Sequence, residues 1–261
     1  MDSQTVYEFL HAGDRPVIEG VWKLETGPGE DRIAPDTRCE IIFHLAETPL
    51  ENTATGWRRQ PSKMIYGPLT RVLELKRTSA MRLLAIRLRP DGIGALVDNP
   101  RDLRNQSVDI RDQLTQSWID ALTPDRKSAL PDFRDMALSA FATCVSDSPG
   151  AIRVAMAIGC IDDNPALRPS DMAALSGVSI RTLDRDFMRQ TGLTPGEFLQ
   201  ITRYHAARKA IRAAKCSLSD IAAEHGYADQ AHMTREFRRY AGKTPRLKRG
   251  EDPSDVFYQS G

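Results

Sequence analysis

The stretch Ser170-Asp171-Met172-Ala173-Ala174 returns, with one residue changed, as Ser219-Asp220-Ile221-Ala222-Ala223. The match continues downstream, where Gly192-Leu193-Thr194-Pro195 corresponds to Gly242-Lys243-Thr244-Pro245. The offset is about 49 residues before a one-residue insertion and about 50 after it, a period that is typical of a repeated supersecondary unit. Residues 170–245 therefore contain one structural unit twice.

Each copy has the pattern of two short helices joined by a tight turn. Gly177 and Gly226 occupy the turn, where glycine adopts a positive φ at little steric cost. Ser, Thr, Asp and Asn are the preferred caps at a helix start, because their side chains accept a backbone N–H of the first turn. The expected N-caps are Ser170 and Ser179 in the first copy and Ser219 and Asp229 in the second.

The second helix of each copy has one apolar face and one polar face. Leu183 and Phe187, like Met233 and Phe237, lie four residues apart and are expected to point inward. Hydrogen-bond donors on the opposite face of a rigid helix suit contact with base edges in a major groove. The predicted base-reading residues are Arg181, Asp184, Arg185, Gln230, Ala231, His232 and Arg235, and the predicted DNA-backbone contacts are Ser179, Arg189, Arg238, Arg239 and Lys243.

The segment between the copies predicts one long helix. Thr194 is the expected cap, Pro195 suits the first helical position and Glu197 falls in the first turn. Apolar residues then recur at helical spacing from Phe198 to Ile211. A helix over 194–215 is about 30 Å long at 1.5 Å per residue. It would separate two reading helices by about one turn of B-DNA, roughly 34 Å.

The second copy is similar to a known family signature. Residues 226–245 read Gly-Tyr-x-Asp-Gln-x-His-Met-Thr-Arg-x-Phe-Arg-Arg-x-x-Gly-x-Thr-Pro. This pattern resembles the AraC/XylS family of bacterial transcription regulators, and the likeness extends over about 100 residues at the C-terminal end. It implies a double helix-turn-helix DNA-binding domain. Met233 replaces the usual Phe, and Lys248 replaces an aromatic residue that usually follows the last Pro, but neither belongs to the reading face.

Composition supports a division into two parts. At 261 residues the chain has room for about two domains. Lys and Arg number 36 against 35 Asp and Glu, yet residues 151–250 hold 17 against 10. The basic character therefore lies with the repeat, as expected for a DNA reader joined to a sensor or dimerisation domain.

The chain predicts a cytoplasmic protein. Its cysteines, Cys39, Cys144, Cys160 and Cys216, lack metal or redox spacing and fit reduced thiols. No apolar run approaches the roughly 18 residues of a membrane span, so no membrane partner is expected. The first residues also lack the basic and apolar regions of a secretory signal.

Residues 6 to 120 predict short β-strands. Candidate strands are 17–24, 40–45, 64–66, 70–75 and 81–89, with turns at 27–29 and 90–92. Strands at this spacing predict a small β-barrel or sandwich. In the AraC/XylS family this position is commonly filled by a cupin-like β-barrel that senses an effector. The resemblance therefore implies an α+β chain: a cupin-like N-terminal sensor barrel with flanking helices, then an all-α domain of two helix-turn-helix units joined by a long helix.

A short helix is expected directly after the last predicted strand, and the chain becomes mainly helical from Asp102. Expected helices are 93–97, 107–114, 117–122, 132–145 and 152–161. The helix over 132–145 packs either on its own barrel or on a second subunit, and the pattern leaves both open. The predicted domains are 1–128, a β-rich effector or dimerisation domain; 129–149, a helical linker; 150–250, an AraC-type DNA-binding domain; and 251–261, a flexible tail.

Neither catalysis nor metal binding is predicted. A metal-dependent cupin needs about three imidazoles and a carboxylate, whereas this half offers His11 and His44 without a His-x-His pair. His44, between Phe43 and Leu45, is expected to be a strand residue with satisfied hydrogen bonds. The lone Cys39 does not supply the zinc-bound cysteine cluster of methyl-transfer repair proteins, which share the DNA-binding module. We therefore expect no catalytic residue, no metal and no cofactor.

The predicted function is sequence-specific regulation of transcription, with two recognition helices reading adjacent major-groove segments. Control by a small organic effector at the N-terminal domain is the expected input. Expected partners are double-stranded operator DNA, the effector, a second copy in a homodimer, and RNA polymerase if the protein activates. The alternatives are a cupin-type metal-binding or catalytic domain that carries a DNA-binding module, and an adaptor whose helix-turn-helix units bind protein.

Overall fold

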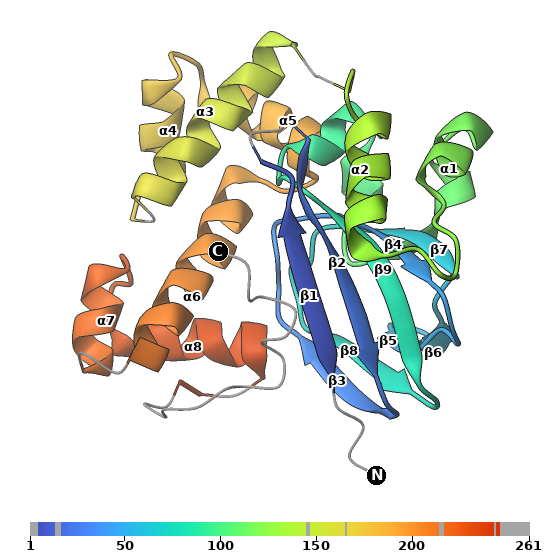
Figure 1. The fold of residues 1–261 in the computed structure, drawn as a ribbon. Helices are drawn as coiled ribbons and strands as arrows, with labels where there is room; N and C mark the ends of the chain where they lie inside the picture. The colour runs from blue at the N-terminus through green and yellow to red at the C-terminus, as the bar shows by residue number, and fades with distance from the viewer. Residues whose placement is uncertain are drawn as a thin grey trace.

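The chain folds into an antiparallel β half followed by a helical half (Figure 1). The computed structural model describes residues 5–13, 17–144, 147–164, 166–213, 217–242 and 244–245. Lys243, Lys248, Cys216 and the expected tail 251–261 lie outside these ranges. The strands are β1 (Val6–His11), β2 (Ile18–Thr26), β3 (Gly29–Ile33), β4 (Glu40–His44), β5 (Leu50–Thr53), β6 (Gly56–Arg59), β7 (Lys63–Tyr66), β8 (Leu73–Arg77), β9 (Met81–Leu88) and β10 (Ser107–Asp109).

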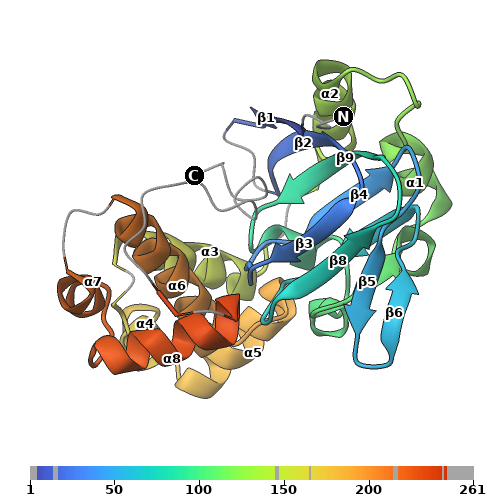
Figure 2. The same cartoon turned by 90° about the horizontal axis from the view of Figure 1, so that it is seen from below.

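Two antiparallel sheets face each other as a flattened barrel (Figure 2). One sheet has the order β1-β2-β9-β4-β7-β10 and the other has the order β3-β8-β5-β6. Side chains alternate across the larger sheet: Ile41 and Phe43 pack towards the covering helices, while Ile42 packs towards the smaller sheet. Because β9 is covered on both faces, it is apolar almost throughout rather than in strict alternation.

Short helices cover the outer face of the larger sheet. These are the 3₁₀ turns η1 (Gly92–Ala95), η2 (Pro100–Leu103) and η3 (Ile110–Asp112), with α1 (Gln116–Leu122) and α2 (Leu130–Ala140). In α2, Phe133 is buried and its ring meets the Phe43 ring edge-on at a centroid distance of 5.9 Å. Of the two alternatives for this helix, the structure therefore shows packing on its own barrel.

The expected helix over 107–114 is wrong. Ser107, Val108 and Asp109 pair with β7 as strand β10, and a 3₁₀ turn follows, with Ile110 fully buried. Pairing with the open edge of β7 satisfies backbone groups that a helix would have left exposed. The expected helix over 132–145 is also too long, because α2 ends at Ala140.

The helical half contains two three-helix units around one core. The helices are α3 (Pro149–Asp163), α4 (Pro169–Leu175), α5 (Ile180–Thr191), α6 (Pro195–Ala213), α7 (Leu218–Glu224) and α8 (Gln230–Ala241). The long helix between the copies is confirmed as α6. It begins with the predicted cap, since Glu197 N–H donates to Thr194 Oγ1 at 3.2 Å and Thr194 N–H donates to Glu197 Oε2 at 3.1 Å.

Ser170 and Ser219 are not the N-caps expected from the sequence. The helices start two residues earlier than expected, so Arg168 and Ser217 occupy the cap positions. Ser217 Oγ accepts from Asp220 N–H at 3.2 Å, and Asp220 Oδ2 accepts from Ser217 N–H at 3.2 Å. This reciprocal pair satisfies two backbone donors, whereas a cap at Ser219 would satisfy one.

The two halves meet along α5 and α6 (Figure 1). The Arg104 guanidinium donates to both carboxylate oxygens of Glu197, with Nη1–Oε2 at 3.2 Å. Nearby, His205 Nε2 lies 2.7 Å from the Pro35 carbonyl oxygen. At Gly192, where φ is 74°, an added Cβ would lie 2.7 Å from the Pro100 carbonyl oxygen. Close packing and a forked ion pair therefore fix the helical half against the barrel.

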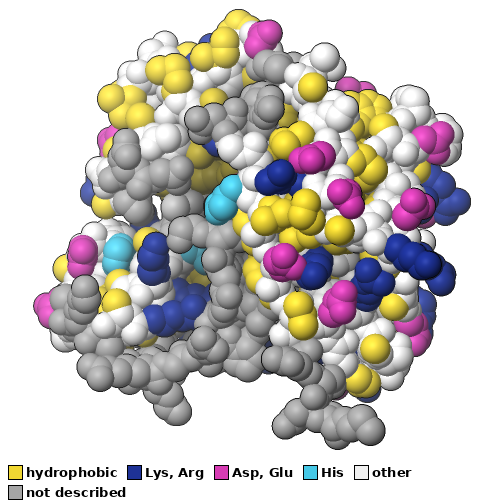
Figure 3. Space-filling model, viewed as in Figure 1, with side chains coloured by type: hydrophobic (Ala, Val, Ile, Leu, Met, Phe, Trp, Pro, Cys, Tyr) yellow, Lys and Arg dark blue, Asp and Glu magenta, His cyan; other side chains and the backbone are white. Residues whose placement is uncertain are grey.

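The surface of the β half carries charges of both signs. On the face seen in Figure 3, acidic and basic side chains are interspersed over the β half. The β half contains cross-strand ion pairs near its surface, such as Lys23 with Glu8, at 2.7 Å between Nζ and Oε2. Such exposed pairs add little to stability, typically less than about 1 kcal/mol each.

We expect Phe133→Ala to lower the free energy of unfolding by about 3–5 kcal/mol, because it leaves a cavity between α2 and the sheet. Urea unfolding of the full chain, followed by circular dichroism, measures the change. The matched control is Arg134→Ala on the exposed side of the same helix, with an expected effect within about 0.5 kcal/mol. Equal effects of the two variants would contradict the packing of α2 on its own barrel.

Candidate nucleic-acid interface and barrel cavity

The first reading helix, α5, presents an exposed polar face. Ser179 Oγ accepts from Thr182 N–H at 3.1 Å at its start, and Gly192 ends it with a φ of 74°. Leu183 and Phe187 are fully buried against the other helices. The predicted reading residues therefore point outward: Arg181 and Arg185 are exposed, and Asp184 is half-buried.

The second reading helix, α8, repeats this arrangement. Asp229 Oδ1 accepts from His232 N–H at 2.6 Å, so the predicted cap is confirmed. Met233 and Phe237 are buried, while Ala231 and Arg235 are exposed. The sequence-predicted inward and outward faces are therefore confirmed for both helices.

Two predicted reading residues of α8 are held by local hydrogen bonds. Gln230 Oε1 accepts from Ser219 Oγ at 2.9 Å, which ties the start of α8 to α7. His232 Nδ1 accepts from Ala228 N–H at 3.3 Å, and the ring meets the Tyr227 ring edge-on at 5.4 Å. These contacts fix the orientation of both side chains without covering Arg235.

Each reading helix carries one buried carboxylate on its inner face, and the sequence interpretation missed both. Asp186 accepts from Arg153 of α3 at 2.5 Å between Oδ2 and Nη2. In the second unit Glu236 accepts from the Tyr227 hydroxyl at 2.9 Å. Arg203 of α6 lies over the Tyr227 ring, 5.6 Å from its centroid. The same offset of 50 residues relates both acids and both arginines, so the repeat itself could have identified them.

The two units differ in how these acids treat the exposed arginines. Arg185 Nη2 lies 3.4 Å from Asp186 Oδ1, so this arginine is tethered to its own helix. Burial raises the pKa of Glu236, while the Tyr227 hydroxyl and Arg203 oppose the shift. Within the described residues no ion pair is recorded for Arg235. The second helix therefore offers the less restrained guanidinium.

The predicted backbone contacts lie at the edges of these faces. Arg189, Arg238 and Arg239 are exposed, and the Arg239 guanidinium stacks 5.3 Å from the Tyr240 ring centroid. Ser179 is engaged as the α5 cap, and Lys243 lies outside the described residues. The roles assigned to these side chains in DNA contact stay predictions.

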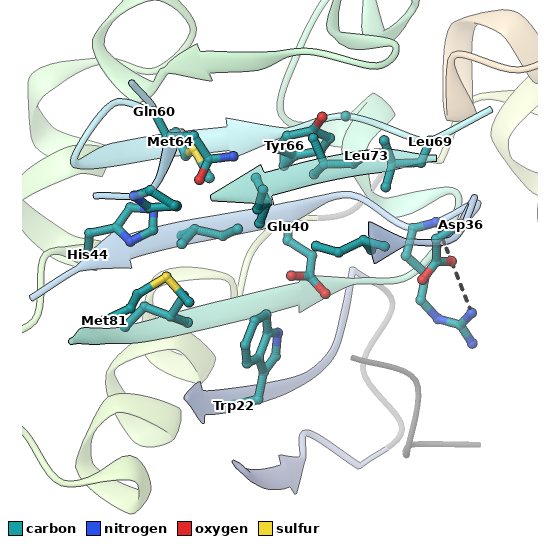
Figure 4. Close-up of a pocket in the computed structure, with 17 residues that line it drawn as sticks. Trp22, Asp36, Glu40, His44, Gln60, Met64, Tyr66, Leu69, Leu73 and Met81 are labelled. Carbon is teal, nitrogen blue, oxygen red and sulfur yellow. Dashed lines mark hydrogen bonds and ion pairs between the residues drawn. The ribbon is translucent and has the colours of Figure 1, made fainter. Parts of the chain in front are cut away.

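A cavity opens between the two sheets of the barrel. Its volume is about 650 Å³, including the space at its mouth. Figure 4 shows inward side chains from several strands around it, with Trp22, Met64, Leu73 and Met81 among its apolar walls. Asp36 lies at one end, Glu40 near the middle, and His44 and Gln60 towards the other end.

The acidic side chains of the cavity are neutralised by arginines. Glu40 Oε1 accepts from Arg87 Nε at 2.9 Å, and Asp36 Oδ1 lies 3.5 Å from Arg38 Nη1. Burial alone would raise the pKa of Asp36, but Arg38 and His205 hold it below its usual value. Burial raises the pKa of Glu40, which Arg87 partly offsets.

His44 differs from the sequence expectation. It lies on β4 as expected, but its hydrogen bonds are not satisfied: both ring nitrogens are buried without a hydrogen-bond partner among the described residues. Burial lowers the pKa of His44 to about 4, and a weak polar interaction with the Gln60 side chain opposes the shift. That interaction lacks the geometry of a full hydrogen bond, so both ring nitrogens can still accept a better partner. Because of its low pKa, the ring is neutral at physiological pH.

The described residues offer neither a metal site nor a membrane span. No group of three or more His, Cys, Asp or Glu side chains there is placed to hold a metal ion. No described helix combines the length and apolar character needed to cross a membrane.

Comparison with known proteins identifies two matching families. A helix-turn-helix domain family matches residues 172–250, and a domain of unknown function, DUF6597, matches residues 15–109. The chain is 40% identical over 76 residues to the HTH-type transcriptional activator RhaS of Escherichia coli O9:H4 (strain HS). That match covers 29% of this chain and 27% of RhaS, so the chain spans about a quarter of that relative's length.

Solved structures give broader but weaker likenesses. ToxT from Vibrio cholerae aligns over 100% of both chains, with a TM-score of 0.46 and 10% identity. The DNA-binding domain of AdpA, solved with a target DNA, aligns over 38% of this chain and 87% of its own, with a TM-score of 0.33 and 27% identity.

The duplicated units, each with an exposed arginine-bearing second helix, define the C-terminal half as a helix-turn-helix DNA-binding domain. The signature over residues 226–245 and the match to RhaS specify it further. This domain is of the kind found in the AraC/XylS family.

His44 should make stability depend on pH. Its pKa is 6.5 when unfolded and about 4 when folded, so between these values the unfolded chain binds a proton that the folded chain does not. The free energy of unfolding is therefore unaffected by the titration of His44 above pH 6.5. It falls as the pH drops from 6.5 towards 4, by about 3 kcal/mol at most. Urea unfolding from pH 7.5 to 4.5 should show a steeper decline for the unaltered chain than for His44→Leu. Parallel profiles would contradict this prediction.

Proposed function

We propose that this protein is a bacterial transcription regulator that reads two adjacent major-groove segments with α5 and α8. The observation that carries the proposal is the duplicated unit, in which Arg185 and Arg235 occupy equivalent exposed positions two residues before a buried Phe. Arg is well suited to bidentate contact with guanine O6 and N7. A helix anchored on its opposite face by a packed core can hold such a side chain in register with the groove.

The remaining roles follow from position on each unit. Arg181 and Asp184 flank Arg185 on α5, whereas Gln230, Ala231 and His232 lie at the N-terminal end of α8, which approaches base edges in helix-turn-helix complexes. Ser179, Arg189, Arg238, Arg239 and Lys243 would bind phosphates and set the docking register without reading sequence. The activity is binding rather than catalysis, and it takes place in the cytoplasm with the DNA.

Control by an effector is part of the proposal. The barrel cavity would hold the effector, and its wall approaches the DNA-binding half directly. Asp36 lines the cavity, and its neighbour Pro35 contacts His205 of α6 at 2.7 Å. A ligand that displaced Pro35 and Asp36 would alter the packing of α6, the helix that joins the two reading helices. The further proposed partners are a second copy of the chain and, for an activator, RNA polymerase. The proposed domain boundaries remain those predicted from the sequence: 1–128, 129–149, 150–250 and 251–261.

Arg185→Ala and Arg235→Ala should each weaken binding to an operator, selected from genomic fragments, by about 1–3 kcal/mol and relax specificity at one groove segment. Arg235→Ala should be the more damaging, because Arg185 is already tethered to Asp186. Fluorescence anisotropy on the operator and on its single-base variants, from 50 to 200 mM salt, measures both effects. The two affected segments should lie about 10 base pairs apart.

Arg126→Ala is the matched control, since it removes an exposed arginine charge from the barrel half. It should leave operator affinity within about twofold. Uniform losses across all base variants for both reading-helix mutants would reduce these arginines to phosphate contacts. Absence of salt-dependent DNA binding by the folded chain would refute the proposed function itself.

A further inference from the structure

The walls of the barrel cavity are mostly apolar. They are built from inward-facing residues of the larger sheet, such as Trp22, Ile42 and Leu83, and of the smaller one, such as Leu75. These side chains belong to a core cluster separate from the one that packs under α1 and α2. The cavity is thus open space inside an apolar interior, which favours a ligand that removes apolar surface from water.

The charged side chains that line the cavity already have ion-pair partners. Three lining residues are normally charged at neutral pH, Asp36, Arg38 and Glu40. Each is engaged in an ion pair: Arg38 with Asp36 and Glu19, and Glu40 with Arg87. A charged ligand would have to break one of these pairs or remain uncompensated in an apolar space, and both are costly. The lining therefore selects against carboxylates and ammonium groups.

Among the described residues that line the cavity, His44 carries polar ring atoms available to a ligand. Its ring nitrogens are both buried, and neither has a hydrogen-bond partner among the described residues. A neutral imidazole has one donor and one acceptor nitrogen, and leaving them unpaired in a buried site is unfavourable. A ligand hydroxyl can satisfy either nitrogen. Figure 4 places the ring at one end of the cavity, beside Gln60, Met64 and Met81.

We propose that the barrel cavity binds one uncharged, largely apolar organic molecule whose hydroxyl or carbonyl group hydrogen-bonds His44. The ligand fills the space between the sheets, with its polar group at the His44 end and its hydrocarbon part against Trp22 and the leucines. Its role as an effector rests on the proposed function above. Binding itself does not, because it is measured without DNA.

The test uses four matched probes and the full chain. 4-tert-Butylphenol is uncharged and has a hydroxyl; tert-butylbenzene lacks the hydroxyl; 4-tert-butylbenzoate is an anion; and 4-tert-butylbenzylammonium is a cation. Isothermal titration calorimetry at pH 7.5 should give one site for the phenol. We expect affinity about fivefold to tenfold lower for the hydrocarbon. The two ions should bind at least about a hundredfold more weakly.

Two variants separate the site from non-specific binding. His44→Leu should bind the phenol no better than the hydrocarbon, while its affinity for the hydrocarbon is retained. Met81→Trp should fill the His44 end of the cavity and abolish saturable binding of the phenol. Leu10→Met, outside the cavity lining, is the control and should bind like the unaltered chain. Thermal melts establish that each variant is folded.

Three outcomes would overturn the proposal. They are no saturable binding of 4-tert-butylphenol, equal or tighter binding of either ion, and a phenol preference that survives His44→Leu. None of them bears on DNA reading, since operator affinity of the same preparations is measured separately. A loss of operator binding with phenol binding intact would instead remove the proposed function and leave the ligand site standing.

Discussion

The fork between Arg104 and Glu197 is the contact on which the arrangement of this molecule depends. Glu197 has two tasks, because the carboxylate that accepts from Arg104 also accepts from the Thr194 backbone and hydroxyl at the start of α6. The residue that begins the central helix therefore also joins it to the barrel half. An ion pair that is partly buried and bidentate fixes direction as well as distance. Loss of either partner would leave the other charged group partly buried without compensation.

Because α6 belongs to both helix-turn-helix units, fixing α6 fixes the two reading helices together. Its buried face runs from Phe198 through Tyr204 to Ile211, and it contacts the first unit at one end and the second at the other. The Phe198 ring meets Phe187 of α5 at 5.7 Å, and the Tyr204 ring meets Phe237 of α8 at 4.8 Å. Each reading helix thus packs on the same helix, α6, through one aromatic pair. The separation of the two heads follows from the helix rather than from a flexible linker.

Local chemistry determined which parts of this structure could be predicted from the sequence. The repeat, the α6 cap at Thr194 and the inward stripes of α5 and α8 follow from spacing, and the structure confirms them. The hairpin of β5 and β6 could not be predicted in this way, because every residue of β6 is exposed and no apolar alternation marks it. Strand β10 was missed because it is defined by the open edge of β7, which is distant in sequence.

The candidate sites follow the same division. The outward faces of α5 and α8 are a consequence of helical periodicity and could be read from the chain, as could their shared arginine position. The cavity could not, since it depends on which strands face each other across two sheets. His44 shows the difference: its neighbours Phe43 and Leu45 predict a strand, but the absence of a partner for its ring among the described residues is a property of the assembled barrel.

The two reading helices differ in the partners of their buried carboxylates. Sequence repetition suggests equivalent units, yet the buried acid of each helix has different hydrogen-bond and ion-pair partners. Asp186 takes two arginines, Arg153 from α3 and Arg185 from its own helix, so part of the charge of Arg185 is already compensated before DNA arrives.

In the second unit Glu236 is instead satisfied by the Tyr227 hydroxyl, and Arg203 lies against the Tyr227 ring. Arg185 must therefore release or share a carboxylate to contact a base, whereas Arg235 has no such competitor recorded among the described residues. An arginine that keeps a carboxylate partner is also restricted in direction. The first head should consequently be the more selective in geometry and the second the larger contributor to affinity, although both descend from one duplicated unit.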